Sequence, residues 1–66
     1  MVNNIEIGER LRAIRGERSA EAISVDMGVS KSAWCMYERG ERIPRDEVKK
    51  RISEYSGKSV QELFYD

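Results

Sequence analysis

Glycine residues divide this chain into short segments, and within the segments apolar residues recur at helical spacing. In the stretch before Gly16, Ile7, Leu11 and Ile14 are separated by four and three residues, which places them on one face of an α-helix. No run alternates apolar and polar residues in the manner of a strand. The sequence therefore predicts an all-α fold of five short helices.

Capping residues and glycines indicate where these helices begin and end. Side-chain oxygens of asparagine and serine accept the free amide hydrogens at a helix start, and glycine commonly follows the last turn. Pro44, whose fixed φ suits a first turn, is expected to open the fourth helix. In the fifth, Ser59 and Glu62 have the spacing of a capping box. The predicted helices follow Asn3 or Asn4, Ser19, Ser30, Pro44 and Ser59, and span about residues 4–15, 20–27, 31–39, 44–56 and 60–64.

The third helix carries two aromatic residues that have two possible roles. Trp34 and Tyr37 could be stacking platforms for bases, as in proteins that bind single strands. Together with Ala33, however, they form an apolar stripe, and we expect both rings to pack in the core. Other residues expected to face inward are Ala22, Ile23, Met27, Val29, Val48, Ile52 and Tyr55. Val60, Leu63 and Phe64 form a short apolar face in the last predicted helix.

The composition argues against several classes of protein. Cys35 is the only cysteine and histidine is absent, so we expect no disulfide, metal site or cofactor. We interpret Cys35 as an inert thiol rather than a redox sensor. No catalytic constellation or glycine-rich phosphate loop is visible, so the protein is not expected to be an enzyme. No apolar run reaches about 18 residues, which favours a soluble, cytoplasmic protein.

The charges of the chain balance. Twelve basic and twelve acidic residues give a net charge of zero, which by itself does not indicate a nucleic-acid binder, because such domains are often basic. The distribution is less even, since basic residues cluster within residues 10–18 and again within residues 31–45. A solvated surface of salt bridges is the simplest explanation of this pattern.

The stretch "MGVS" joins the second and third predicted helices. Gly28 allows a tight turn with positive φ, Val29 fills the corner between the helices, and Ser30 caps the next helix, whose amino end can meet a phosphate. This pattern is typical of a helix-turn-helix, which we place at about residues 19–39.

The sequence resembles the xenobiotic-response-element family of bacterial and phage regulators, which contains the lambda-repressor and Cro-like domains. The resemblance extends from "IGERLRAIR" through "AISVDMGVSKSAWCMYERGERIP" to "VQELF". It implies a single compact five-helix, lambda-repressor-like domain over residues 1–66. It also implies that the third helix enters the DNA major groove, commonly in a homodimer on a pseudo-palindromic operator.

The resemblance implies roles for individual residues in base reading. Lys31 and Ser32 at the start of the third helix, and Met36 one turn later, are expected to read bases. Lysine can donate to the O6 and N7 atoms of guanine, and a methionine can press on a thymine methyl group. A solubilising role for the charge of Lys31 and a merely exposed Met36 are the alternatives.

The resemblance also implies contacts to the DNA backbone and within the protein. The backbone amides near Ser19 and Ser30, together with the side chains of Arg39 and Arg42, are expected to hold phosphates. Arg15 and Glu38 match family positions that form a structural ion pair between the first and third helices.

Two features depart from the family pattern, and one remains open. Most members have glutamine at the position of Ala20, and the connector "GER" after the first helix is about two residues shorter than usual. These two departures leave open whether the second helix contacts a phosphate. At the end of the chain, Leu63, Phe64 and Tyr65 could cap the core of the monomer or form a dimer interface.

We therefore expect a sequence-specific regulator of phage or bacterial transcription that binds double-stranded DNA and acts as a repressor, by occupying its site and not by chemistry. The competing hypothesis is a protein-interaction module of helix-turn-helix shape, such as an antitoxin-like or anti-repressor partner, with weak or no DNA binding. Zero net charge and Ala20 favour the module, whereas Lys31, Arg39 and Arg42 favour DNA. We see no sign of a small-molecule ligand.

Overall fold

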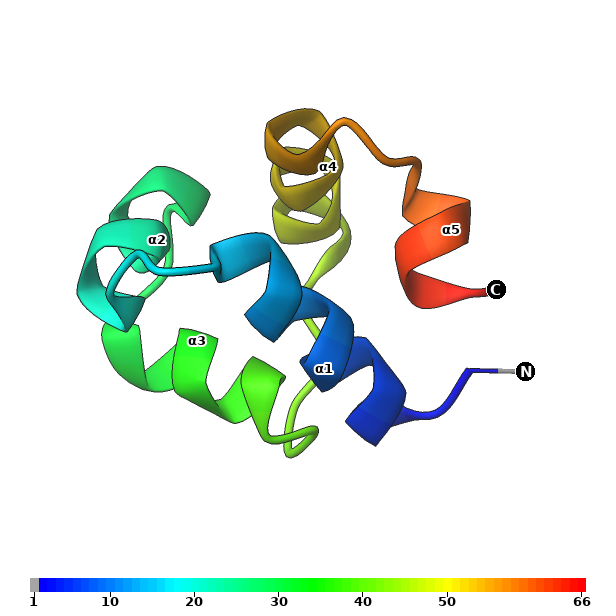
Figure 1. Ribbon diagram of the computed structural model, residues 1–66, viewed down its shortest axis with the longest axis horizontal. Coiled ribbons are helices and arrows are strands. Elements are labelled where there is room, and N and C mark those ends of the chain that lie inside the picture. Colours follow the sequence, from blue (N-terminus) through cyan, green and yellow to red (C-terminus); the bar gives the residue numbers. More distant parts are fainter. Residues whose placement is uncertain (1) are drawn as a thin grey trace.

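A computed structural model describes residues 2–66 and confirms the all-α prediction (Figure 1). Residue 1 of the predicted domain lies outside the described residues. No strand occurs within residues 2–66. The helix α1 lies in the middle of the molecule, with α2 and α3 toward one end and α5 toward the other (Figure 1). The helices are α1 (Asn4–Arg15), α2 (Ala20–Met27), α3 (Lys31–Glu38), α4 (Asp46–Ser56) and α5 (Val60–Phe64).

Local capping explains four of the five helix starts. The side chain at each N-cap accepts a hydrogen bond from the backbone N–H three residues later. Of the two candidates at the first helix, Asn3 is the cap. At the last helix the Ser59 N–H also donates to the Glu62 carboxylate, which completes the predicted capping box. The capping side chains are Asn3, Ser19, Ser30 and Ser59.

Two predictions about the fourth helix are wrong. Pro44 does not open it: the helix begins at Asp46, and Arg45 at the N-cap has an extended backbone with φ −69° and ψ 163°. Pro44 is buried in the preceding connection, so it contributes to packing rather than to the first turn. Tyr55 is 42% exposed instead of facing the core. Its hydroxyl accepts a hydrogen bond from Arg18 at 3.0 Å, and this contact keeps the ring at the surface.

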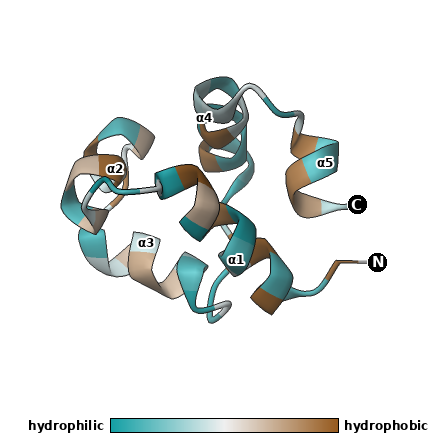
Figure 2. Ribbon diagram, viewed as in Figure 1, coloured by the Kyte–Doolittle hydropathy of each residue, from teal (hydrophilic) through white to brown (hydrophobic). Residues whose placement is uncertain are grey.

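The core combines residues from all five helices. Trp34 and Tyr37 are buried there, with their rings edge to face at a centroid separation of 6.2 Å, so their predicted packing role is confirmed. Each helix carries both hydrophobic and hydrophilic segments (Figure 2), as expected for elements that bury one side. The buried apolar residues are Ile7, Leu11, Ile23, Met27, Trp34, Tyr37, Ile52, Leu63 and Phe64.

Two close contacts join the helices around this core. At Gly8, an added Cβ atom would lie only 2.2 Å from the carbonyl oxygen of Glu38, so α1 and α3 touch backbone to backbone at this point. On the other side of the core the buried Lys49 of α4 donates a hydrogen bond to the Tyr65 hydroxyl at 2.9 Å and lies over the ring of Phe64. Neither contact was predicted from the sequence.

Candidate nucleic-acid interface

The turn between α2 and α3 fixes the direction of α3. Gly28 has φ +72° and ψ 31°, a left-handed conformation that glycine adopts without a steric cost. The backbone N–H of Val29 then donates to the Ser24 carbonyl at 3.0 Å, and the Val29 side chain packs against the core. The chain therefore reverses within two residues and presents the start of α3 at the surface, as the helix-turn-helix prediction requires.

One side of α3 is open to solvent and slightly hollowed. The hollow has a volume of about 340 Å³. Its lining residues follow the spacing i, i+1, i+4, i+5 and i+8, which is one face of a helix. We call this surface the reading face, and its residues are Lys31, Ser32, Cys35, Met36 and Arg39.

The reading face brings together the residues that were predicted to read bases. Lys31 and Ser32 are exposed in the first turn, and Met36 is partly exposed one turn later. Trp34 and Tyr37 occupy the opposite side of the same helix and are buried. The helix is thus fixed by one side and free on the other. Cys35, for which the sequence indicates no task, lies among the free side chains.

The cations in and beside the reading face differ in whether a carboxylate of the protein pairs with them. The Lys31 Nζ atom lies 3.7 Å from a carboxylate oxygen of Glu21, in a loose and exposed contact. Arg39 donates two hydrogen bonds to Glu41, from Nε at 3.0 Å and from Nη2 at 3.2 Å. These bonds lower the pKa of the Glu41 carboxyl below its usual value. Arg42 is exposed and has no ion-pair partner within residues 2–66.

The two serines predicted near the DNA backbone act as helix caps. The Ser19 hydroxyl accepts from the Ala22 N–H and the Ser30 hydroxyl from the Ala33 N–H, each at 3.0 Å. Both hydroxyls lie at the amino ends of their helices, where the helix dipole favours an anion. Ser30 directly precedes the reading face, whereas Ser19 begins α2.

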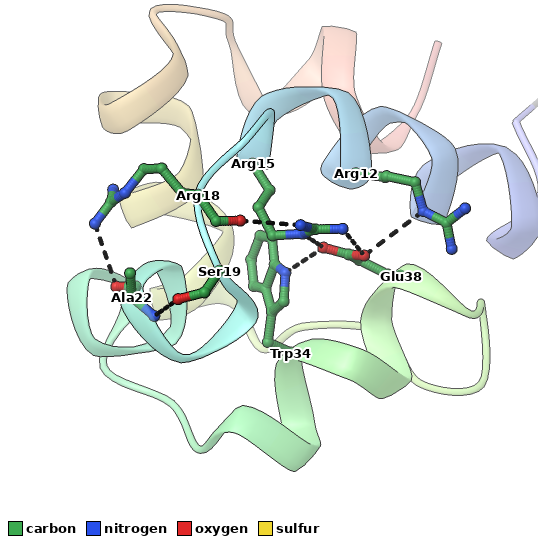
Figure 3. A network of polar contacts seen from close by, with 7 residues as sticks. All are labelled: Arg12, Arg15, Arg18, Ser19, Ala22, Trp34 and Glu38. Carbon is green, nitrogen blue, oxygen red and sulfur yellow. Dashed lines mark hydrogen bonds and ion pairs between the residues drawn. The ribbon is translucent and has the colours of Figure 1, made fainter.

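Glu38 at the end of α3 joins several side chains in one network (Figure 3). Arg15 of α1 donates to it from Nε at 2.6 Å and from Nη2 at 3.1 Å. The indole N–H of Trp34 donates to the same carboxylate, and Arg12 Nε lies 3.7 Å away. The sequence indicated Arg15 and Glu38 only, because family position does not reveal that the buried indole needs an acceptor.

The charge state of Glu38 follows from this network. Burial raises the pKa of its carboxyl, but the hydrogen bonds from Arg15 and Trp34 and the positive charges of Arg15 and Arg12 outweigh the burial and lower the pKa below its usual value. The ionised carboxylate therefore ties α3 to α1 at neutral pH.

The end of the chain divides between core and surface. Leu63 and Phe64 are 2% and 4% exposed, so in the monomer they cap the core and leave little surface for a second copy. This placement favours the first of the two roles considered for them. Tyr65 is 53% exposed, although its hydroxyl is bonded to Lys49.

Sequence reasoning missed the two carboxylates that contact the reading face. Glu41 follows Arg39 by two residues in "RGE", and this adjacency of opposite charges across a glycine turn is the signal that could have indicated the pair. Glu21 stands ten residues before Lys31, and only the turn at Gly28 brings the two together. Among residues 2–66, none of the helices combines the length and apolar character needed to cross a membrane.

Comparison with known proteins agrees with this geometry. A family model described as a helix-turn-helix domain matches residues 6–63. No curated protein matches the chain significantly. Among solved structures, the chain is similar to the restriction-modification controller protein C.AhdI from Aeromonas hydrophila, with 26% identity over 91% of this chain and 94% of that chain and a TM-score of 0.76. Since the family model covers most of the sequence, the chain belongs to the helix-turn-helix domain family.

Proposed function

We propose that the protein binds double-stranded DNA at specific sequences and regulates transcription by occupying its site, as a member of the xenobiotic-response-element group. The observation that carries this proposal is the division of α3 into two sides. Its buried aromatic side holds the helix to the core, and its open side presents Lys31, Ser32 and Met36 together. A helix exposed and fixed in this manner fits the major groove of B-DNA.

Three residues of the reading face have proposed tasks in base reading. Lys31 donates to the O6 and N7 atoms of a guanine, Ser32 bonds to a neighbouring base edge, and Met36 presses on a thymine methyl group. The protein performs no chemistry on the DNA, because its effect follows from occupying the site. A protein with this target acts in the cytoplasm, and repression is the simplest consequence of occupancy.

Contacts to phosphates set the register of the helix on the duplex. Arg42 is free to meet a phosphate, and Arg39 reaches one when it leaves Glu41. The amino ends of α2 and α3, at Ser19 and Ser30, contribute backbone N–H groups. Because Ala20 lacks the side chain that clamps the backbone in most relatives, the contact at α2 is the weaker of the two.

We further propose that two copies bind one operator with pseudo-palindromic halves. The similarity to a restriction-modification controller protein supports a regulatory role. Within each copy, Leu63 and Phe64 are engaged in the core. Of the three residues considered for the dimer interface, Tyr65 therefore has the most surface to offer a second copy.

Selection of bound duplexes from a random library, followed by sequencing, tests the proposal directly. We expect an enriched site with two related halves. Binding of the wild-type protein to random duplex should fall steeply as salt rises, because phosphate contacts release counterions. Absence of binding to any duplex at low salt would overturn the proposal and would leave the protein-interaction module as the explanation.

Substitutions separate base reading from phosphate contact. Lys31→Ala should cost about 1–3 kcal/mol on the selected site and relax the preference at one base pair. Arg42→Ala should weaken binding to all sequences by a similar factor. Lys58→Ala, in the connection between α4 and α5, serves as the matched control, since Lys58 is an exposed cation outside α3. An unchanged base preference in Lys31→Ala would show that Lys31 does not read the site.

A further inference from the structure

Two carboxylates of the protein itself, Glu21 and Glu41, contact cations of the reading face, although DNA is an anion as well. Three cations in and beside the face are available for DNA, namely Lys31, Arg39 and Arg42. Two of them contact carboxylates in the free protein. These carboxylates reduce the positive potential expected of a DNA-binding surface at the place where the DNA is to bind.

The contact between Arg39 and Glu41 has the geometry of a strong pair. Both oxygens of the carboxylate accept from the guanidinium, at 3.0 Å and 3.2 Å. A phosphate that approaches this side of the guanidinium uses the same two parallel donors, since carboxylate and phosphate both match the guanidinium fork. One guanidinium cannot present the same Nε and Nη2 hydrogens fully to both anions, so Glu41 and a phosphate compete for them.

The turn after α3 holds Glu41 in place for this contact. Gly40 has φ +74°, and its backbone packs against the start of α1, where an added Cβ would lie 3.0 Å from the Asn4 carbonyl oxygen. The Gly40 N–H donates to the Tyr37 carbonyl at 3.1 Å, and the Glu41 N–H donates to the Met36 carbonyl at 2.9 Å. Because the backbone is already ordered, the pair forms at a smaller cost in entropy than an exposed pair on flexible chain.

We propose that Glu41 competes with DNA phosphates for Arg39 and thereby lowers the affinity of the protein for every duplex. The inference rests on the proposed function, because it assumes that this face meets DNA. It assigns Glu41 a task that opposes binding: a regulator that holds bulk DNA weakly stays available for its operator. Arg42, which has no such partner within residues 2–66, provides a phosphate contact without a competitor.

The test measures affinity for a random-sequence duplex at low salt, with full-length variants. Glu41→Gln removes the charge and keeps the shape, and we expect it to bind about two- to five-fold more tightly than wild type, the upper part of the range of an exposed ion pair. Glu54→Gln makes the same change of charge on α4, on the other side of α1 from α3 (Figure 1), and is expected to bind with nearly wild-type affinity.

A double-mutant cycle shows whether the effect passes through Arg39. In the Arg39→Ala background we expect Glu41→Gln to have no larger effect than the Glu54→Gln control. Conversely, in the wild-type background Arg39→Ala should weaken binding less than Arg42→Ala does. In the Glu41→Gln background the two arginine substitutions should weaken binding by comparable factors.

Three outcomes would count against these statements in different ways. The first is that Glu41→Gln binds duplex no more tightly than Glu54→Gln, and the second is that Glu41→Gln gives its full increase in affinity in the Arg39→Ala background. Either result would overturn the proposed competition and leave the proposal of DNA binding intact. If the wild-type protein bound no duplex at low salt, the proposed function itself would fail. Thermal melting of each variant by circular dichroism checks that the exposed substitutions leave the fold unchanged.

Discussion

At the scale of single residues, Glu38 decides how firmly the reading helix is attached. It is 9% exposed at its side chain and accepts hydrogen bonds from Arg15 and Trp34. These donors come from α1 and from the buried side of α3, so one carboxylate pairs with an arginine and also satisfies an indole N–H that would otherwise be left without an acceptor. The orientation of α3 therefore depends on a charge that lies outside the reading face.

Glu38→Gln tests this dependence. The variant keeps the volume of the side chain but leaves the charge of Arg15 less compensated, and we expect a loss of about 1–3 kcal/mol in the free energy of unfolding at neutral pH. Urea denaturation followed by circular dichroism measures it. Glu54→Gln, a substitution of an exposed glutamate on α4, should be close to neutral.

The lowered pKa of Glu38 gives the sign of a pH dependence. A carboxyl group whose pKa is lower in the folded than in the unfolded state contributes its full stability above the unfolded value, about 4.3 for glutamate, and loses it as the pH falls through the folded value. The difference in stability between wild type and Glu38→Gln should therefore shrink as the solution is acidified below about pH 4. A constant difference over that range would show that the charge of Glu38 is not what stabilises the fold.

At the scale of elements, the position of α3 is set by its close approach to α1. Gly8 is the residue that allows it, because any side chain there would meet the carbonyl of Glu38 at 2.2 Å. Two considerations oppose each other at this position. Alanine favours a helix over glycine by about 1 kcal/mol, whereas separating two packed backbones costs about 1–3 kcal/mol or more.

We expect packing to prevail, so that Gly8→Ala destabilises the protein by about 1–3 kcal/mol in urea denaturation despite the gain in helix propensity. Gly57→Ala is a useful comparison, because nothing lies within 4 Å of its added Cβ and its φ is +76°. Its cost, about 1–2 kcal/mol, reflects the left-handed backbone alone. A Gly8→Ala variant more stable than wild type would show that α1 and α3 are less tightly packed than described.

The helices could be predicted from the sequence because their signals are local. Ser19 and Ser30 bind amides of their own helices, and Trp34 belongs to a stripe that is visible in the sequence. Contacts between elements were not predictable in this manner. The backbone contact at Gly8 and the bond from Lys49 to Tyr65 depend on how helices cross, which no single segment encodes.

In the candidate site, too, contacts between separate segments could not be predicted from the sequence. Family resemblance indicated the open side of α3, but it carried no information on Glu41, since the pairing of Arg39 depends on how Gly40 turns the chain. Tyr55 was misassigned for a related reason: its helical position predicts an inward ring, and the hydrogen bond from Arg18 holds it outside.

At the scale of the whole molecule, size limits what one copy can recognise. The chain has extents of 29 × 22 × 21 Å, and its reading helix α3 has eight residues. At 1.5 Å per residue this helix is about 12 Å long, which matches roughly four base pairs of B-DNA at 3.4 Å each. A sequence this short recurs by chance every few hundred base pairs, so one copy cannot distinguish an operator from the rest of a genome.

For this reason we expect two copies of the chain per operator. Half-sites should lie about one helical turn apart, about 34–36 Å or 10–10.5 base pairs, so that both reading helices meet the same side of the duplex. Sedimentation of the protein with a labelled operator should give two chains per duplex.

Two altered operators test the need for both halves. Replacing one half-site by unrelated sequence, in a duplex of the same length, should reduce affinity at least ten-fold. Inserting five base pairs between the halves places them on opposite sides of the duplex, and this operator should bind as weakly as the one with a single half-site. One chain per duplex with full affinity for a single half would contradict this expectation. Tyr65→Ala, which removes an exposed ring and spares Leu63 and Phe64, then shows whether the carboxyl end contributes to the pairing of the two copies.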